Sequence, residues 1–145
     1  MPELLDQSQT RAQAEGLAVE YQQADAEYLP FAAVQFDYVV STFCVMFAPN
    51  QTQAAAELLR VCKSGGKIGL ANWTPDGFIG RLFKIVGKYV APPAGVNSPA
   101  LWGTEVFIRE NFGPHATNIE IQPRQFTFRY LSADHWIEVF RTYYG

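Results

Sequence analysis

The feature that most constrains the fold is a strand, helix and strand pattern in the middle of the chain. The run QFDYVVSTFCVMF is apolar almost throughout, as expected for a strand covered on both faces, and we place that strand at Phe36 to Ser41. Asn50 then predicts a helix N-cap, and Gly65-Gly66 predicts the helix stop before a second strand at 67–71. Strands joined by such a crossover helix are expected to be parallel neighbours.

The N-terminal segment predicts a helix followed by a strand. Pro2 stands at an early helical position, strong helix formers follow, and Gly16 is a typical stop, so we expect a helix at residues 2–15. The alternation in LAVEYQQAD then predicts a half-buried strand that ends near Gln23. A helix, a glycine stop and a strand are typical of the second half of a βαβ unit.

Helical signals continue after the second strand of the central pattern. Apolar residues recur at helical spacing in residues 78–90, a segment rich in proline and glycine follows, and Thr104 predicts the cap of a short helix. We therefore expect a helical insert at about residues 75–113.

The last third of the chain predicts a hairpin and a final helix. Residues 116–131 alternate around Pro123, which favours two antiparallel strands, and Ser132 predicts the cap of an amphipathic helix. A chain of 145 residues is the length of one domain, so we expect residues 1–145 to form a single domain.

Charge and composition exclude several classes of function. The formal net charge is -3, and the Lys and Arg residues are scattered, which argues against a nucleic acid partner. No apolar run reaches the roughly 18 residues of a membrane span, and the N-terminus lacks the pattern of a signal peptide, so we expect a cytoplasmic protein with no membrane partner. Cys44 and Cys62 are expected to be free buried thiols. His115 and His135 are expected to be surface or cap residues rather than general bases.

The order of these segments closely resembles one family. ADAEYLPF, FDYVVSTF, AAAELLRVCKSGG and KIGLANW resemble the second half of a class I S-adenosylmethionine-dependent methyltransferase of the ubiquinone/menaquinone-biosynthesis type. The resemblance covers about residues 2–145. It implies an α/β fold, with a partial Rossmann-like methyltransferase sheet of strands 3, 4 and 5, an antiparallel hairpin of strands 6 and 7, and flanking helices. The family's Gly-rich cofactor loop and ribose-binding carboxylate lie before this region, so we expect a truncated domain.

The resemblance also implies a site for S-adenosylmethionine. Asp25 matches the aspartate that accepts a hydrogen bond from the adenine amine, and Ala26 would offer its backbone N–H to a ring nitrogen. The implied cofactor residues are Asp25, Ala26, Ser41, Thr42 and Phe43, and the residues that would line an apolar acceptor site are Phe47, Trp73 and Trp102. The alternatives are that Asp25 caps a turn and that the three aromatic residues are core.

Two functions from different classes follow. The first is an S-adenosylmethionine-dependent methyltransferase acting on an unknown small molecule. The second is a non-catalytic binding or oligomerisation module on the same half-sheet, which the high aromatic and low charged content favours. An NAD-dependent enzyme has little support, because the chain has no G-x-G-x-x-G. Without strands 1 and 2 the central edge would be open, so we expect either strand 3 to move beside strand 4 or two chains to pair as a homodimer.

Overall fold

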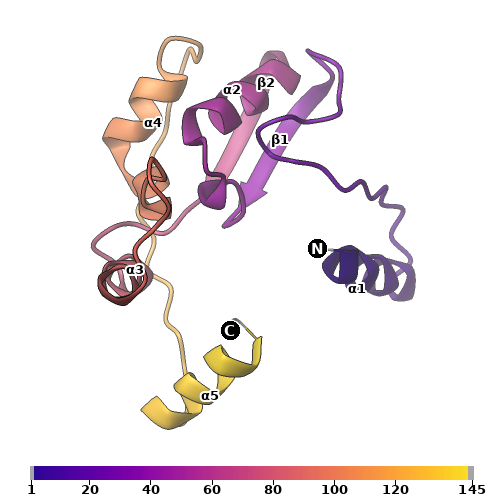
Figure 1. The fold of residues 1–145 in the computed structure, drawn as a ribbon. Helices are drawn as coiled ribbons and strands as arrows, with labels where there is room; N and C mark the ends of the chain where they lie inside the picture. The colour runs from indigo at the N-terminus through magenta and orange to yellow at the C-terminus, as the bar shows by residue number, and fades with distance from the viewer. Residues whose placement is uncertain (1, 144–145) are drawn as a thin grey trace.

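The centre of the molecule is a parallel pair of strands joined by one helix. The computed structural model describes residues 2–143, and their side chains from Leu4 onward. Strand β1 (Phe36–Thr42) lies beside strand β2 (Cys62–Ala71), and helix α2 (Gln51–Val61) connects them (Figure 1). Val39 lies opposite Ile68 in this ladder. The predicted parallel crossover is therefore confirmed.

The N-terminus of α2 agrees with the sequence prediction, and its C-terminus does not. The side chain of Asn50 accepts a hydrogen bond from the Gln53 N–H at 3.1 Å, as an N-cap does. The helix ends at Val61, and β2 begins at the next residue. The prediction that Gly65-Gly66 stops the helix was therefore wrong. These glycines lie inside β2, where the register shifts and Gly65 has a φ of 77°.

Helix α1 (Pro2–Ala14) ends as predicted, but the strand expected after it does not form. The N–H of Gly16 donates to Gln13 O at 3.1 Å, and that of Leu17 donates to Ala12 O at 2.9 Å. This pair of bonds, with a φ of 67° at Gly16, is a Schellman end. Residues 17–23 then run as irregular chain, exposed except at Tyr21, because no strand among residues 2–143 lies beside them to form a ladder. Strand 3 therefore does not cover the edge of β1.

The predicted insert region holds three helical elements. They are α3 (Phe78–Tyr89), the 3-10 helix η2 (Pro99–Gly103) and α4 (Glu105–Phe112). Thr104 caps α4 as predicted, since its hydroxyl accepts from the Phe107 N–H at 3.3 Å.

The hairpin predicted at residues 116–131 is absent from the described structure. Residues 118–130 are extended without ladder partners, and Pro123 has no N–H to donate. The side chains of Phe126 and Phe128 contact the ring of Trp73 instead of a partner strand. Helix α5 (Ala133–Tyr143) follows, and the hydroxyl of Ser132 accepts from the His135 N–H at 3.1 Å, which confirms the predicted cap.

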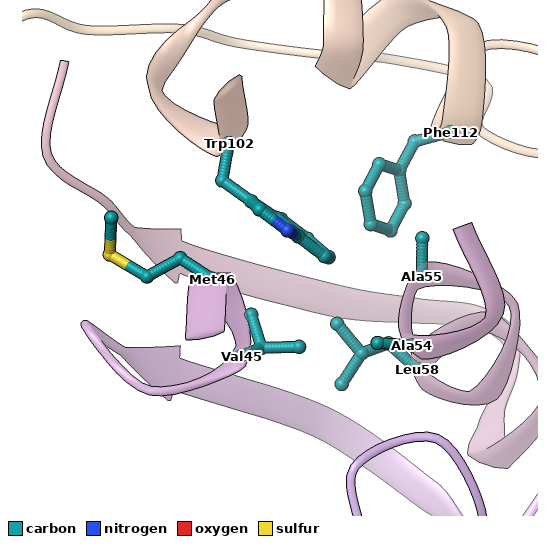
Figure 2. Packing of buried hydrophobic residues seen from close by; sticks show 7 residues of the cluster. All are labelled: Val45, Met46, Ala54, Ala55, Leu58, Trp102 and Phe112. Atoms are coloured by element: carbon teal, nitrogen blue, oxygen red, sulfur yellow. The ribbon is translucent and has the colours of Figure 1, made fainter. Parts of the chain in front are cut away.

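The buried core lies on one face of the sheet only. It is formed by α2, the 3-10 helix η1 (Val45–Phe47), η2 and α4. Figure 2 shows the side chains that meet there, which are Val45, Met46, Ala54, Ala55, Leu58, Trp102 and Phe112. The expectation that β1 is covered on both faces was wrong, because Tyr38 and Val40 on the other face are 69% and 70% exposed.

Two further expectations concern the thiols and the membrane. Both cysteines are free, but Cys44 is exposed and Cys62 only half-buried, so the expectation of buried thiols was wrong for Cys44 and met only in part for Cys62. Cys44 lies in the turn after β1, outside the core. Within residues 2–143, no helix combines the length and apolar character needed to cross a membrane.

Candidate functional site

The chain turns sharply at the carboxyl end of β1. The Phe43 N–H donates to Ala71 O at 2.8 Å, which extends the ladder one residue beyond the strand. Phe43 itself has a φ of 55°, a left-handed conformation that is uncommon for a bulky residue and is found at functional sites. The Ser41 hydroxyl accepts from the Val45 N–H at 3.1 Å and so holds the turn into η1. The predicted residues Ser41, Thr42 and Phe43 thus form one fixed corner of the sheet.

Asp25 stabilises a turn of its own. One carboxylate oxygen accepts from the Glu27 N–H at 2.9 Å, and the Asp25 carbonyl accepts from the Tyr28 N–H at 3.1 Å. This is the turn-capping role given above as the alternative for Asp25. The residue is exposed, while Ala26 is partly buried and packs against the core. A capping role and a ligand contact are compatible, because the capping bond uses only Oδ1.

Glu27 fixes that turn against the start of α2. Its Oε1 accepts from the Asn50 N–H at 2.6 Å, and its carbonyl accepts from the Gln53 side chain at 3.1 Å. Asn50 is the cap of α2, and only seven residues separate it from Thr42 at the end of β1. The Asp25 turn and the Ser41 to Phe43 corner therefore lie at the same end of the sheet. This is the end at which parallel α/β sheets bind ligands.

A partly buried ion pair holds the segment that follows the turn. Glu57 is 7% exposed, and its Oε2 accepts from the Leu29 N–H at 2.7 Å. Arg60 donates to Glu57 Oε1 at 2.6 Å and also to the carbonyls of Leu29 and Phe31, at 2.9 and 2.8 Å. The hydrogen bond from Arg60 holds the pKa of Glu57 below its ordinary value, against the opposing effect of burial.

Sequence reasoning missed this pair. The signal that could have found it is a glutamate and an arginine three residues apart on a helix whose inward face is mostly apolar. The same reasoning missed Glu27, whose role depends on a contact with a residue 23 positions away.

The three aromatic residues expected to line an acceptor site lie in different places. Trp73 stacks on Phe43, with ring centroids 4.2 Å apart, and belongs to an aromatic strip that begins at the carboxyl ends of both strands and continues to α3 and α5. The members of this strip are Phe43, Trp73, Phe78, Phe126, Phe128, Trp136 and Phe140. Phe47 is exposed and meets Phe83 edge to face at 6.0 Å. Trp102 is 1% exposed in the core, so it presents no surface to a ligand.

A hollow lies beside the N-terminus of α2. It is bordered by the first turn of α2, from Asn50 to Thr52, and by the loop 94–97. Gln51 is buried there, and its side-chain nitrogen donates to Ser98 O at 3.1 Å while its side-chain oxygen has no protein partner among the described residues. No group of His, Cys, Asp or Glu within the described chain could hold a metal ion.

Comparison with known proteins agrees with the resemblance. A family model for the methyltransferase domain matches residues 1–70. An uncharacterised protein of Mycobacterium tuberculosis is 42% identical over 146 residues, which cover 99% of this chain and 53% of that protein. A demethylmenaquinone methyltransferase of Deinococcus radiodurans is 28% identical over 113 residues, covering 77% of this chain and 47% of the enzyme.

These matches support a class I S-adenosylmethionine-dependent methyltransferase. The solved structure of the YcgJ protein from Bacillus subtilis has the same fold, with a TM-score of 0.57 and 24% sequence identity. The matched region covers 77% of this chain and 48% of the YcgJ chain. The chain spans about half the length of the relatives that it matches. The α/β fold with a parallel sheet and flanking helices is confirmed.

Proposed function

We propose that this chain forms the adenine-binding side of an S-adenosylmethionine site and takes part in methyl transfer to a small molecule. One observation carries the proposal. The hydrogen bond from the Asn50 N–H to Glu27 connects the Asp25 turn to the N-cap of α2. This contact lies at the end of the sheet where Ser41, Thr42 and Phe43 form a corner. The match of residues 1–70 to the methyltransferase domain supports the same ligand.

The residues fit the adenine and methionine-sulfur parts of the cofactor. The exposed carboxylate of Asp25 would accept a hydrogen bond from the adenine amine, and the backbone of Ala26 would meet the ring. The corner at Ser41, Thr42 and Phe43 would border the sulfonium. When bound, S-adenosylmethionine supplies a methyl group that is already activated for displacement. The contribution of these residues would then be to hold and orient it, which is a large part of catalysis for such a reaction.

The fit does not extend to the rest of the cofactor. No Gly-rich loop follows a strand in residues 2–143, and Gly65-Gly66 lies in the ladder of β2. The proposal is therefore restricted to the adenine and sulfonium contacts of residues 25–43, and it assigns no catalytic residue.

An apolar, flat acceptor suits the surface next to the corner. Phe43 and Trp73 stack with an interplanar angle of 19°, and Trp73 continues the aromatic strip toward Phe126 and Phe128. Rings of this kind bind other planar groups by offset stacking. We keep Phe47 and Trp73 as proposed acceptor contacts, and we leave out Trp102 because it is buried.

The second candidate is a non-catalytic binding or oligomerisation module. The observation that favours it is the exposure of large apolar side chains on β1, on α3 and in the extended segments. We propose a cytoplasmic location for either function. Cys44 and Cys62 are both free, as is usual for cysteines in a reducing compartment.

Isothermal titration calorimetry with S-adenosylhomocysteine tests the proposal. We expect binding in the micromolar range that Asp25→Ala abolishes and Asp76→Ala retains, since Asp76 is also an exposed loop aspartate but lies in the segment between β2 and α3. Absence of heat at high ligand concentration, from a chain with a cooperative thermal transition, would contradict cofactor binding and leave the module as the better account.

A further inference from the structure

The charged residues of helix α3 are all basic and lie on one face. Arg81, Lys84 and Lys88 are three and four residues apart, a spacing that places side chains on the same side of a helix. None of the three forms an ion pair among the described residues. The nearest carboxylates in the sequence are Asp76 and Glu105, which lie beyond the two ends of the helix. A chain with a net charge of -3 thus carries a local group of cations without acidic partners.

An apolar stripe borders this basic face. Leu82, Ile85, Val86 and Tyr89 are also three and four residues apart, so they form a second face of the same helix. Arg81 precedes Ile85 by four residues, which makes the two faces neighbours. Ile85, Val86 and Tyr89 are 54%, 48% and 85% exposed. The two faces are a property of the sequence of α3 itself.

A third side of α3 faces the rest of the molecule. Ile79 is buried, and the backbone of Gly80 lies so close to the carbonyl oxygen of Thr74 that no Cβ would fit between them. Phe83 meets the ring of Phe47 edge to face, with centroids 6.0 Å apart. The contacts of this side leave the apolar stripe and the basic face pointing away from the core.

We propose that α3 is a peripheral docking site for an anionic lipid bilayer. The helix lies along the membrane surface, with the apolar stripe inserted at the boundary of the acyl chains and the basic residues at the lipid phosphates. Charge complementarity favours this occupant. An apolar stripe alone would suit many partners, but a bordering face of cations without any carboxylate suits a dense negative surface.

The length of α3 agrees with this role. Its 12 residues are too few to cross a bilayer, but a helix that lies along the surface needs no spanning length. The expectation of no membrane partner considered only a spanning segment and a signal peptide. The long stems of Arg81, Lys84 and Lys88 can lie beside the stripe while their charged groups reach the phosphates.

Vesicle sedimentation of the 145-residue chain tests the proposal. Vesicles of phosphatidylcholine mixed with phosphatidylglycerol should bind the chain, and binding should weaken as the salt concentration rises. Vesicles of phosphatidylcholine alone should bind it much less. Each basic residue near an anionic surface contributes roughly a fivefold factor to partitioning. Replacement of Arg81, Lys84 and Lys88 together by Gln should therefore weaken binding by roughly 100-fold.

The matched control removes the same number of cations from other elements. Arg11, Lys67 and Arg124 are exposed and lie in α1, in β2 and in the extended segment before α5. Their joint replacement by Gln gives the same net charge as the α3 variant. It should leave binding to the anionic vesicles within a few-fold of the unmodified chain.

A second pair of variants tests the apolar stripe. Ile85→Ser with Tyr89→Ser should also weaken binding, whereas Val106→Ser with Leu131→Ser should not, because Val106 and Leu131 are 66% and 92% exposed but lie outside α3. Far-ultraviolet circular dichroism and a thermal transition like those of the unmodified chain would show that each variant is folded.

Three results would overturn the proposal. The first is absence of binding to the anionic vesicles, which would leave an acidic protein surface as the better occupant of α3. The second is equal binding to both kinds of vesicle, and the third is unchanged binding of the folded α3 variants. The comparison of lipids and of salt concentrations uses the unmodified chain, so it does not depend on how any variant folds. None of these measurements involves the cofactor, so the test is independent of the calorimetry.

Discussion

The backbone N–H of Leu29 donates to the carboxylate of Glu57 at 2.7 Å, although the two residues are 28 positions apart. Through this bond and those from Arg60, helix α2 holds the segment that follows the Asp25 turn. The proposed adenine-binding turn is therefore fixed from both ends of α2, by Asn50 through Glu27 and by Glu57 near its C-terminus. The precision of the turn depends on residues that would not touch a ligand.

Glu57→Gln should lower the free energy of unfolding by about 1–3 kcal/mol, because a charge-assisted hydrogen bond and a partly buried ion pair are weakened together. Glu105→Gln is the control, since Glu105 forms an ion pair with Arg109 at the same 2.6 Å but in solvent. Its effect should stay within about 0.5 kcal/mol. Urea unfolding measures both, and equal losses would show that burial of the Glu57 pair is unimportant.

The same pair predicts a dependence of stability on pH. The pKa of Glu57 lies below its ordinary value of 4.5 in the folded chain. A carboxyl group whose pKa is lowered by folding stabilises the folded chain at pH values above its pKa in the unfolded chain. This stabilisation is lost as the pH falls through the pKa in the folded chain. The urea concentration at the midpoint of unfolding should therefore decrease as the pH is lowered below about 4.5, and this decrease should be smaller in Glu57→Gln. Identical acid profiles for the two chains would contradict this role.

Trp73 and Trp102 should respond differently to truncation. Trp102→Ala removes a core side chain that is 1% exposed and should cost about 3–5 kcal/mol. Trp73→Ala removes a partly exposed ring of the aromatic strip and should cost less, while weakening the binding of planar apolar ligands. Thermal unfolding and fluorescence titration with a hydrophobic dye separate the two effects. Equal stability losses with equal dye binding would argue against distinct roles.

A side chain at Gly66 is expected to destabilise the β1–β2 ladder. A Cβ at this position would lie 2.9 Å from the carbonyl oxygens of Asp37 and Lys63, which belong to backbone and cannot move away freely. Gly66→Ala should destabilise the chain by about 1–3 kcal/mol. Gly87→Ala in α3 meets nothing within 4 Å and should stabilise it by about 0.5–1 kcal/mol, as alanine does in a helix. Chemical denaturation of both variants provides the comparison, and a neutral Gly66→Ala would contradict the crowding of the ladder.

The elements that could be predicted from sequence are those with local signals. Asn50, Thr104 and Ser132 each cap the helix that they were expected to cap, because capping needs only a side chain and an amide two or three residues away. The strands β1 and β2 were found for a related reason. Their crossover helix lies between them in sequence, so the whole unit can be recognised in one window.

The strands predicted at residues 17–23 and 116–131 failed for a physical reason. Alternation of apolar and polar residues indicates that a segment suits a sheet with one covered face. A ladder also needs a neighbouring strand at hydrogen-bonding distance. Neither segment has one among residues 2–143. Residues 17–23 remain exposed near α1, where Tyr21 donates to Ser8 O at 2.9 Å, and the later segment packs through Phe126 and Phe128.

The candidate site was predictable in part. The resemblance named Asp25 and the corner at Ser41 to Phe43, and the structure places them at one end of the sheet. It could not name Glu27, Glu57 or Arg60, because their partners are distant in sequence and become visible only in three dimensions. Whether Asp25 and Ala26 contact adenine stays a prediction.

The position of β1, α2 and β2 in one uninterrupted stretch has a consequence for how the chain folds. Tyr38 pairs with Lys67, and the segment between them contains one helix, α2. The central ladder therefore forms between residues that are close in sequence, without a contribution from either terminus. Folding rates rise as contacting residues come closer in sequence. Residues 36–71 are therefore expected to form the nucleus, with high φ-values at Val39 and Leu58, while α1 and α5 dock later and leave the rate unchanged when mutated.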